Sequence, residues 1–283
     1  MAVKKRTGEA DHSVRPFLKW AGNKYRILDR VKKHLPEGKR LVEPFAGSGA
    51  LFLNTGYERY LLCDSNRDLI DLYNLLKDEG TAFIELAQSL FTEANNCAER
   101  YYALREEFNQ CAEPQRRAAL FVYLNRHGYN GLCRYNANNG FNVPFGRYKR
   151  PYFPAREMLL FHQRAQRAIF RHQDFATTLR QSRRGDVIYC DPPYLPLSPS
   201  ANFTSYSAGG FDLAQQEQLA ALSQAAAARG IPVLISNHNT AEARRIYHNA
   251  KLQRFTVQRY ISCNGEKRNK AGELIALYSA EQG

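Results

Sequence analysis

An acidic residue, two prolines and a tyrosine follow a short apolar run in the stretch DVIYCDPPY, residues 186 to 194. Each proline fixes φ and lacks a backbone N–H, so the segment from Asp191 to Tyr194 is stiff and extended. A stiff segment at the end of a strand can hold a carboxylate and an aromatic ring toward a ligand. The alternative interpretation is a turn that the two prolines stabilise, but such a turn does not require an acidic residue beside an aromatic one.

A second candidate for chemistry is EPFAGSGALF, residues 43 to 52. Gly47 and Gly49 follow a predicted strand and open a helix, which permits a tight turn and the close approach of a ligand. The dinucleotide fingerprint would place a third glycine where Phe52 stands, so a pyrophosphate cofactor is disfavoured. Asp64 ends the next predicted strand, where a carboxylate can accept hydrogen bonds from ribose hydroxyls. The pattern favours a nucleoside without a diphosphate, and a tight turn followed by a helix N-cap is the alternative.

Several classes of protein are excluded by composition. The six cysteines lie far apart without a CxxC pair, and the seven histidines form no HExxH motif, so we expect reduced thiols in a cytosol and no metal site. Apolar runs such as IPVLI, residues 231 to 235, fall far short of the roughly 20 residues that cross a bilayer. The polar N-terminus has no apolar signal segment. We expect a monomeric, cytoplasmic protein that does not contact membranes.

The net charge of +13 is unevenly distributed along the chain. Residues 61 to 113 hold 4 Lys/Arg against 11 Asp/Glu, whereas residues 128 to 184 hold 11 against 2. A charged stretch is often only a solvated face, but this basic stretch is interleaved with aromatic residues that could contact exposed bases. Lysine and arginine neutralise phosphates, so nucleic acid is the leading partner class. The aromatic residues are Tyr129, Tyr135, Phe141, Phe145, Tyr148, Tyr152 and Phe153.

The elements that must position these residues alternate between strands and helices, which predicts an α/β fold with a doubly wound, mostly parallel sheet. Helical spacing dominates residues 66 to 126, which predicts a small helical bundle, and Gly, Asn and aromatic residues from 127 to 153 predict a protruding β-hairpin that turns at Asn138–Gly140. We divide the chain into a first part at 1–66, an inserted part at 67–153 with its hairpin at 128–149, and a last part at 154–283. The predicted strands are 40–46, 58–63, 167–173, 187–190, 232–236, 252–262 and 273–279, with helices at 213–229 and 240–250 and a polar turn at 263–273.

The order of these motifs resembles a known enzyme family. KWAGNK, then FAGSG, then an insert, then DPPY is similar to the amino-methylating DNA methyltransferases of group alpha, which use S-adenosylmethionine. NRHGYNGLCRYN, FNVPFGRYKRPYF and ANFTSY resemble the Dam family, the bacterial and phage adenine methyltransferases of GATC sites. The similarity runs from about residue 16 to residue 279, and it implies a Rossmann-like methyltransferase fold. It also implies that residues 1–66 and 154–283 form the catalytic domain and that residues 67–153 recognise the target.

The resemblance also implies a set of cofactor contacts. Composition alone favours a core position for Trp20, the only tryptophan, but the family pattern places it at the cofactor together with its neighbours. The residues that the resemblance assigns to S-adenosylmethionine are Trp20, Ala21, Gly22, Lys24, Phe45, Gly47, Asp64, Asp174, Phe175 and Asp191.

The family's reaction makes chemical demands that DPPY can meet. The lone pair of adenine N6 is delocalised into the ring and is a poor nucleophile. Asp191 and the carbonyl of Pro192 can each accept one N6 hydrogen, which localises that lone pair and stabilises the positive charge that grows during transfer. Tyr194 would stack on an adenine that has been flipped out of the duplex.

Recognition of the DNA sequence is expected of the segment that follows the helical bundle. The resemblance makes Arg134 and Lys19 readers of guanine, and a bidentate arginine is worth roughly 1 to 3 kcal/mol of discrimination. It gives base-contacting or wedge positions to Tyr129, Asn130, Leu132 and Pro144. Phosphate-contacting or orienting positions fall to Arg105, Asn136, Asn142, Arg147 and Ser198.

The chain departs from the family pattern at His127, where a tyrosine is expected, and its first 15 residues carry no motif. Chemistry alone leaves other amino nitrogens open as targets: RNA adenine N6, DNA cytosine N4 or a protein glutamine. The glutamine enzymes usually carry asparagine at the position of Asp191, which weighs against them. A DNA-binding relative without catalysis is the non-enzymatic alternative.

Overall fold

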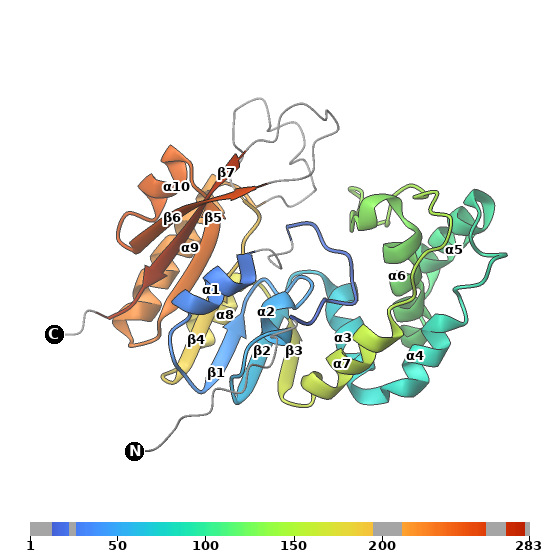
Figure 1. Ribbon diagram of the computed structural model, residues 1–283, viewed down its shortest axis with the longest axis horizontal. Helices are drawn as coiled ribbons and strands as arrows, with labels where there is room; N and C mark the ends of the chain where they lie inside the picture. The colour runs from blue at the N-terminus through green and yellow to red at the C-terminus, as the bar shows by residue number, and fades with distance from the viewer. Residues whose placement is uncertain (1–12, 23–26, 195–210, 259–269, 281–283) are drawn as a thin grey trace, which may run out of the picture.

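A sheet of seven strands lies at the centre of the computed structural model, which describes residues 13–22, 27–194, 211–258 and 270–280 (Figure 1). The strands lie in the order β3-β2-β1-β4-β5-β7-β6. The five strands from β3 to β5 run parallel to one another, whereas β7 is antiparallel to both β5 and β6. The strands are β1 Arg40–Glu43, β2 Arg59–Asp64, β3 Ala168–His172, β4 Asp186–Cys190, β5 Val233–His238, β6 Lys251–Gln258 and β7 Lys270–Tyr278.

The strand order reverses at β1, so the predicted doubly wound, mostly parallel sheet is confirmed. After β2 and β3 have been added on one side of β1, the chain crosses to the other side and forms β4. In open α/β sheets, ligands bind beyond the carboxyl ends of the strands at such a reversal. Here the two strands at the reversal are the ones that FAGSG and DPPY follow.

Helices cover both faces of the sheet, and alternate strand residues pack against each face. Tyr60 and Leu62 of β2 belong to one core with helices α1, α2, α3 and α7, while Leu61 and Cys63 belong to a second core with α8, α9 and α10. Burial on both faces explains why β1, β2, β4 and β5 read as nearly continuous apolar runs. The helices are α1 Leu28–His34, α2 Ala50–Leu53, α3 Arg67–Glu79, α7 Ala155–Ala165, α8 Phe175–Gln181, α9 Leu213–Ala228 and α10 Ala241–Ile246.

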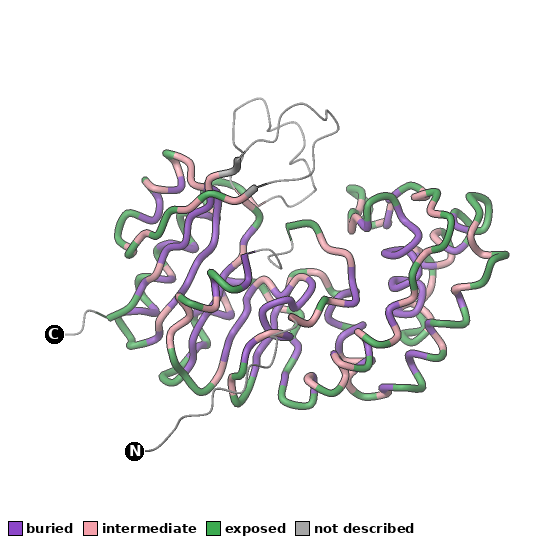
Figure 2. The backbone as a smooth tube through the Cα atoms, in the orientation of Figure 1, coloured by how far each residue is buried: buried purple, intermediate pink, exposed green. Residues whose placement is uncertain are grey.

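The predicted helical bundle is confirmed between β2 and β3. It consists of α3 with α4 Thr81–Gln88, α5 Ala98–Gln110 and α6 Pro114–His127, and it lies away from α9 and α10 (Figure 1). Every residue of helix α6 from Ala118 to His127 is buried. Figure 2 shows buried residues inside this bundle as well as along the sheet. None of the helices in the described ranges is both long and apolar enough to cross a membrane.

The prediction of a protruding β-hairpin at 127–153 is wrong as to its strands. Within the described residues of this segment only two isolated bridges form, Gly128 with Phe145 and Tyr135 with Phe141, after a short 3-10 helix at Tyr129–Gly131. The aromatic side chains decide this outcome, because Phe141 is buried against Phe108 and Phe121 of the bundle instead of standing on a free ribbon.

The turn in this segment forms where the sequence predicts it. The backbone N–H of Asn136 donates to Gly140, and Asn139 adopts the left-handed φ of 58° that asparagine tolerates. We refer to residues 128–149 as the recognition segment.

The last strands differ modestly from expectation. Strand β7 starts at Lys270, inside the polar turn predicted at 263–273, and the rest of that turn lies outside the described residues. Helix α10 ends at Ile246, before the predicted 250, with Tyr247 as its C-cap.

Candidate active site

The turn after β1 is tied to the end of β2. The Ala46 N–H donates to the Cys63 carbonyl at 2.9 Å, and the Gly47 N–H donates to Oδ2 of Asp64 at 3.0 Å. Gly47 has a φ of 45°, and a Cβ built there would meet Nε1 of Trp20 at 3.0 Å, so only glycine fits beneath the indole. Trp20 is half-buried, and it packs against the core while its indole covers this turn.

Asp64 is oriented by backbone donors on both oxygens. Besides Gly47, the N–H of Asn66 donates to Oδ1 at 2.9 Å. Burial raises the pKa of Asp64, and these backbone donors oppose that rise. A carboxylate oxygen has more than one lone pair, so Asp64 retains acceptor capacity for ligand hydroxyls.

An aromatic wall stands beside this turn. Phe45 stacks on Phe175 with ring centroids 5.5 Å apart, and Phe211 meets both rings edge-on at 5.4 and 5.2 Å. Asp174 caps α8 by accepting from the Thr177 N–H at 2.8 Å and the Thr177 hydroxyl at 2.6 Å, and these bonds lower its pKa. The wall offers an apolar face for a flat ring, whereas the carboxylate of Asp174 primarily serves its helix.

Asp191 directly follows β4 and is held by β5. The Ser236 hydroxyl donates to Oδ1 of Asp191 at 3.0 Å and lies 3.0 Å from the hydroxyl of Tyr189. Tyr194 meets His238, at the end of β5, edge-on with ring centroids 4.4 Å apart. Burial raises the pKa of Tyr194, so its phenol stays protonated.

The second proline is fixed from the other face of β5. Gln216 of α9 is fully buried and donates from Nε2 to the Pro193 carbonyl at 2.8 Å. The Gln216 Oε1 accepts from the Tyr247 hydroxyl and from Nδ2 of Asn237, the latter at 3.2 Å. These two donors fix the orientation of the Gln216 amide, so its Nε2 faces the Pro193 carbonyl.

Glu43 at the end of β1 is a functional candidate that the sequence reasoning missed. It is 3% exposed, and its Oε1 has no hydrogen-bond partner among the described residues. Burial raises its pKa to about 8, opposed by a backbone hydrogen bond from Phe52 and reinforced by the charge of Asp191. An acidic residue within an otherwise buried strand is the signal that could have found it.

Comparison with known proteins agrees with these motifs. Residues 20–261 match the family model described as D12 class N6 adenine-specific DNA methyltransferase. The chain belongs to this family. It is 54% identical over 264 residues to a DNA adenine methylase of Salmonella typhi, covering 93% of this chain and 95% of the relative. It is 53% identical to the DNA adenine methylase of Escherichia coli (strain K12) over the same shares of the two chains.

A third relative, the DNA adenine methylase of Vibrio cholerae (strain ATCC 39541), is 52% identical and covers 94% of this chain and 96% of its own. The resemblance to the Dam family is thereby confirmed, and the protein is an adenine-specific DNA methyltransferase. Within the described residues of this methyltransferase, no group of three or more His, Cys, Asp or Glu side chains could hold a metal ion.

Arg134 of the methyltransferase is exposed and oriented. Its Nε donates to Oδ1 of Asn142 at 2.8 Å, its Nη2 donates to the Asn142 carbonyl at 3.2 Å, and the Asn142 N–H donates back to the Arg134 carbonyl. Asn142 thus orients Arg134, which is one of the two roles that the resemblance offered for it.

Lys19 lies against the start of the recognition segment. Its backbone exchanges two hydrogen bonds with the Asn125 side chain at 2.9 and 2.7 Å, and its Nζ lies 4.1 Å from the ring centroid of Tyr148. The Tyr148 hydroxyl accepts from the Asn130 N–H at 3.0 Å. Burial lowers the pKa of Lys19, with the charge of Arg126 adding to the effect. Lys19 thus contacts the recognition segment, and Arg134, the other predicted guanine reader, belongs to that segment.

The remaining predicted DNA contacts divide into exposed and internally bonded residues. Tyr129 is 49% exposed and donates its N–H to the exposed Pro144 at 2.8 Å, while Leu132 is half-buried and Arg147 is exposed with a φ of 54°. Arg105 donates to the Val143 carbonyl at 3.2 Å.

The Oδ1 of Asn136 accepts from the N–H groups of Asn138 and Gly140. These bonds shape the turn and leave that oxygen less available to DNA. Ala21 and Gly22 form an exposed turn beside Trp20. Lys24 and Ser198 lie outside the described residues.

His127, the departure from the family pattern, is an interior residue. It is 1% exposed, stacks on Tyr123 with ring centroids 3.9 Å apart and donates from Nδ1 to the Tyr123 carbonyl at 3.0 Å. Burial lowers its pKa to about 4, so it is neutral at physiological pH. Its side chain therefore belongs to the bundle.

Proposed function

We propose that this methyltransferase transfers the methyl group of S-adenosylmethionine to N6 of an adenine flipped out of duplex DNA at GATC sites. The observation that carries the proposal is the meeting of two motifs at one edge of the sheet. Strands β1 and β4 pair in register, with Val42 opposite Ile188, and they deliver the Gly47 turn and Asp191 beyond the same edge.

The residues at the Gly47 turn fit the proposed cofactor. The indole of Trp20 over the glycine, the oriented carboxylate of Asp64 and the rings of Phe45 and Phe175 suit a nucleoside. The buried Oε1 of Glu43 suits a cationic group, because a buried acceptor without a partner is costly. When bound, S-adenosylmethionine would supply an electrophilic methyl group. Ala21, Gly22, Asp174 and Lys24 remain family-based proposals.

Asp191 and the Pro192 carbonyl would act on the amino group of the target base. Each accepts one N6 hydrogen, so that the nitrogen lone pair turns out of the ring and becomes nucleophilic. The Ser236 hydroxyl holds the Asp191 carboxylate in one orientation, which removes a reorganisation cost at the moment of transfer. Tyr194 would stack on the flipped adenine, with His238 fixing the angle of its ring.

The recognition segment would read the flanking bases. Arg134 offers a guanidinium oriented by Asn142, and bidentate pairing of arginine with guanine O6 and N7 is the commonest specific contact in the major groove. Lys19 would read a second guanine, and Tyr129 or Leu132 would support the space that the flipped base leaves. Asn130, Pro144, Arg105, Asn136, Arg147 and Ser198 would contact bases or phosphates.

A radiolabelled methyl-transfer assay tests the proposal on four substrates: a GATC duplex, a duplex with one base of the site replaced, a duplex of G·C pairs that contains no adenine, and an RNA of the same sequence. We expect label in adenine of the GATC duplex alone. Transfer to RNA or to cytosine N4 at a comparable rate would support the alternative targets, and duplex binding without any transfer would indicate a non-catalytic relative.

Arg134→Ala tests the guanine assignment. Discrimination against duplexes with a substituted guanine should fall by roughly 5- to 150-fold, the range expected for one bidentate pair. Arg150→Ala removes an exposed arginine just beyond the recognition segment and should leave discrimination unchanged while weakening binding to all duplexes. Equal effects of the two substitutions would contradict the assignment.

A further inference from the structure

Both neighbours of Arg134 along the chain are held by the first turn of α3. The Tyr135 hydroxyl donates to Oδ2 of Asp68 at 2.7 Å, and Nδ2 of Asn66 donates to Sγ of Cys133 at 3.4 Å. Asn66 is the N-cap of α3, and Asp68 lies in its first turn. In extended backbone, successive side chains point to opposite sides, so anchoring 133 and 135 inward directs residue 134 outward.

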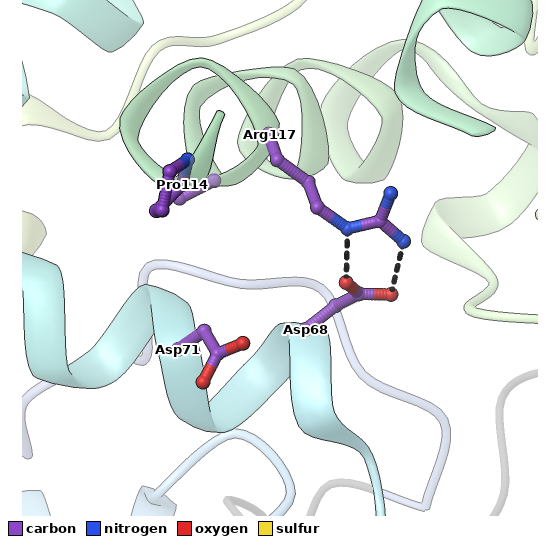
Figure 3. A pocket seen from close by; sticks show the side chains of 5 residues that line it. Asp68, Asp71, Pro114 and Arg117 are labelled. Atoms are coloured by element: carbon purple, nitrogen blue, oxygen red, sulfur yellow. Dashed lines mark hydrogen bonds and ion pairs between the residues drawn. The ribbon is translucent and has the colours of Figure 1, made fainter. Parts of the chain in front are cut away.

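Asp68 is itself immobilised from the bundle. Arg117 of α6 donates from Nε to Oδ1 at 2.6 Å and from Nη2 to Oδ2 at 3.2 Å, and Figure 3 shows the two side chains facing each other across the gap between α3 and α6. The Arg117 guanidinium also donates to the Phe108 carbonyl at 2.6 Å and lies over the Phe108 ring at 4.2 Å. A bidentate pair fixes the carboxylate in two directions, so Tyr135 meets a rigid acceptor.

The same turn of α3 begins at the cofactor side of the site. The Asn66 N–H donates to Asp64, and Asp64 also accepts from Gly47. A continuous set of hydrogen bonds therefore runs from the glycine turn through Asp64 and Asn66 to Cys133, and Asp68 in the same helical turn holds Tyr135. Burial raises the pKa of Tyr135, so its hydroxyl remains a donor.

We propose that Tyr135 and Asp68 are positioning residues that set the direction of Arg134 and thereby the sequence discrimination of the enzyme. The proposal rests on the proposed guanine reading by Arg134. Removing the Tyr135 hydroxyl frees one side of the extended segment, so the guanidinium samples orientations that no longer match O6 and N7 of guanine together. The loss falls on the rate with the correct site, because a duplex without that guanine does not use this contact, and the loss is partial because Asn142 still accepts from the guanidinium.

Tyr135→Phe tests this with the loss of a single hydroxyl. We expect the ratio of kcat/KM on GATC to that on a guanine-substituted duplex to fall about threefold to tenfold, a fraction of what a bidentate arginine contributes. Tyr57→Phe is the matched control, because it removes a hydroxyl that donates to the Pro36 carbonyl at 2.7 Å far from the recognition segment. The control should leave the ratio unchanged.

A double substitution separates positioning from a general loss of stability. In the background of Arg134→Ala, adding Tyr135→Phe should produce no further loss of discrimination, because the group that it positions is gone. Asp68→Asn replaces one of the two oxygens that Arg117 holds with a donor, so it should lower the discrimination as Tyr135→Phe does.

The outcomes are distinguishable. If Arg134→Ala does not alter discrimination, the guanine assignment itself fails. If Arg134→Ala relaxes discrimination but Tyr135→Phe does not, or if the two effects simply add, the positioning role is overturned while the proposed function stands.

Discussion

At the scale of single residues, the acidic groups at the edge of the sheet have contrasting environments. Asp191 is bonded by Ser236 and lies beside the exposed end of the site, whereas Glu43 is enclosed and has one oxygen without a partner among the described residues. Burial disfavours the charged form of Glu43, and the charge of Asp191 adds to this effect. Asp191 is therefore the group suited to accept hydrogens from a base, and Glu43 is the group whose proton depends on what is bound.

Asp191→Ala should abolish most methyl transfer while leaving duplex binding measurable. Removing one preorganised hydrogen-bonding group from a transition state typically costs about 10²- to 10³-fold in kcat. Single-turnover transfer of label measures the rate, and fluorescence anisotropy measures the affinity for the duplex. Asp29→Ala, an exposed acid in the first turn of α1, should change neither. Persistent transfer by Asp191→Ala would refute the proposed role of the carboxylate.

The free energy of unfolding of the ligand-free protein should depend on pH through Glu43. Its folded-state pKa of about 8 lies above the ordinary value of 4.5, so between these values the folded state binds more protons than the unfolded state. The contribution of Glu43 to the free energy of unfolding is fully present below pH 4.5. It falls as the pH rises toward 8, with a slope of up to about 1.4 kcal/mol per pH unit.

Glu43→Gln mimics the protonated form and should flatten this slope, as measured by urea denaturation at a series of pH values. Some slope should remain, because burial raises the pKa of Asp64 in the same direction. An identical pH dependence in the variant and the parent would show that Glu43 is not protonated in the folded state.

At the scale of elements, strand β5 holds the DPPY segment from both faces of the sheet. Ser236 reaches Asp191 on the face where Tyr189 and Leu234 pack, and the next residue, Asn237, supports Gln216 on the face covered by α9 and α10. Adjacent strand residues point to opposite faces, so β5 contacts Asp191 from one face and supports Pro193 through Gln216 from the other. The prolines make the segment stiff, and β5 with α9 decides where it points.

Gln216→Glu should make methyl transfer sensitive to pH. A protonated glutamic acid can still donate to the Pro193 carbonyl, whereas a carboxylate repels that oxygen. We expect the single-turnover rate of the variant to fall below that of the parent as pH rises, by about tenfold or more once the side chain is ionised. The measurement is the pH profile of transfer to the GATC duplex.

Gln224→Glu introduces the same change on the exposed surface of α9 and should follow the parental profile. Parallel pH profiles for Gln216→Glu and the parent would contradict the role of this contact. A rate reduced equally at every pH would point to disturbed packing around the fully buried Gln216.

At the scale of the whole molecule, the helical bundle lies to one side of strands β1 and β4, which carry the residues proposed for methyl transfer (Figure 1). The net charge of +13, with 11 Lys/Arg against 2 Asp/Glu over residues 128 to 184, supports non-specific attraction to phosphates. Arg134 and Lys19 would add sequence reading on top of this attraction. The three-part division of the chain, the monomeric state and the cytoplasmic location stay predictions.

The affinity for duplex DNA should therefore fall steeply with salt. A protein with six to ten phosphate contacts loses roughly 10³- to 10⁵-fold between 50 and 200 mM salt. Filter binding over this range should give parallel losses for GATC and unrelated duplexes, because phosphates carry no sequence information. A nearly flat salt dependence would refute the role of the basic stretch.

The sequence by itself determined the sheet, the bundle and the two chemical motifs, because their signals are local. Apolar runs buried on both faces, helical spacing from 66 to 126, the glycine turn and the paired prolines depend on a few consecutive residues. The tight turn at Asn138–Gly140 is local in the same way.

The tertiary structure decided which polar groups support the site and how the recognition segment is built. Glu43, Ser236 and Gln216 lie far apart along the chain and come near the DPPY segment only when β1, β4, β5 and α9 assemble. Phe141 finds a bundle to pack against, so the predicted hairpin strands give way to isolated bridges. Such contacts depend on which remote segments lie side by side in the folded protein, and the local patterns of a single sequence do not reveal this.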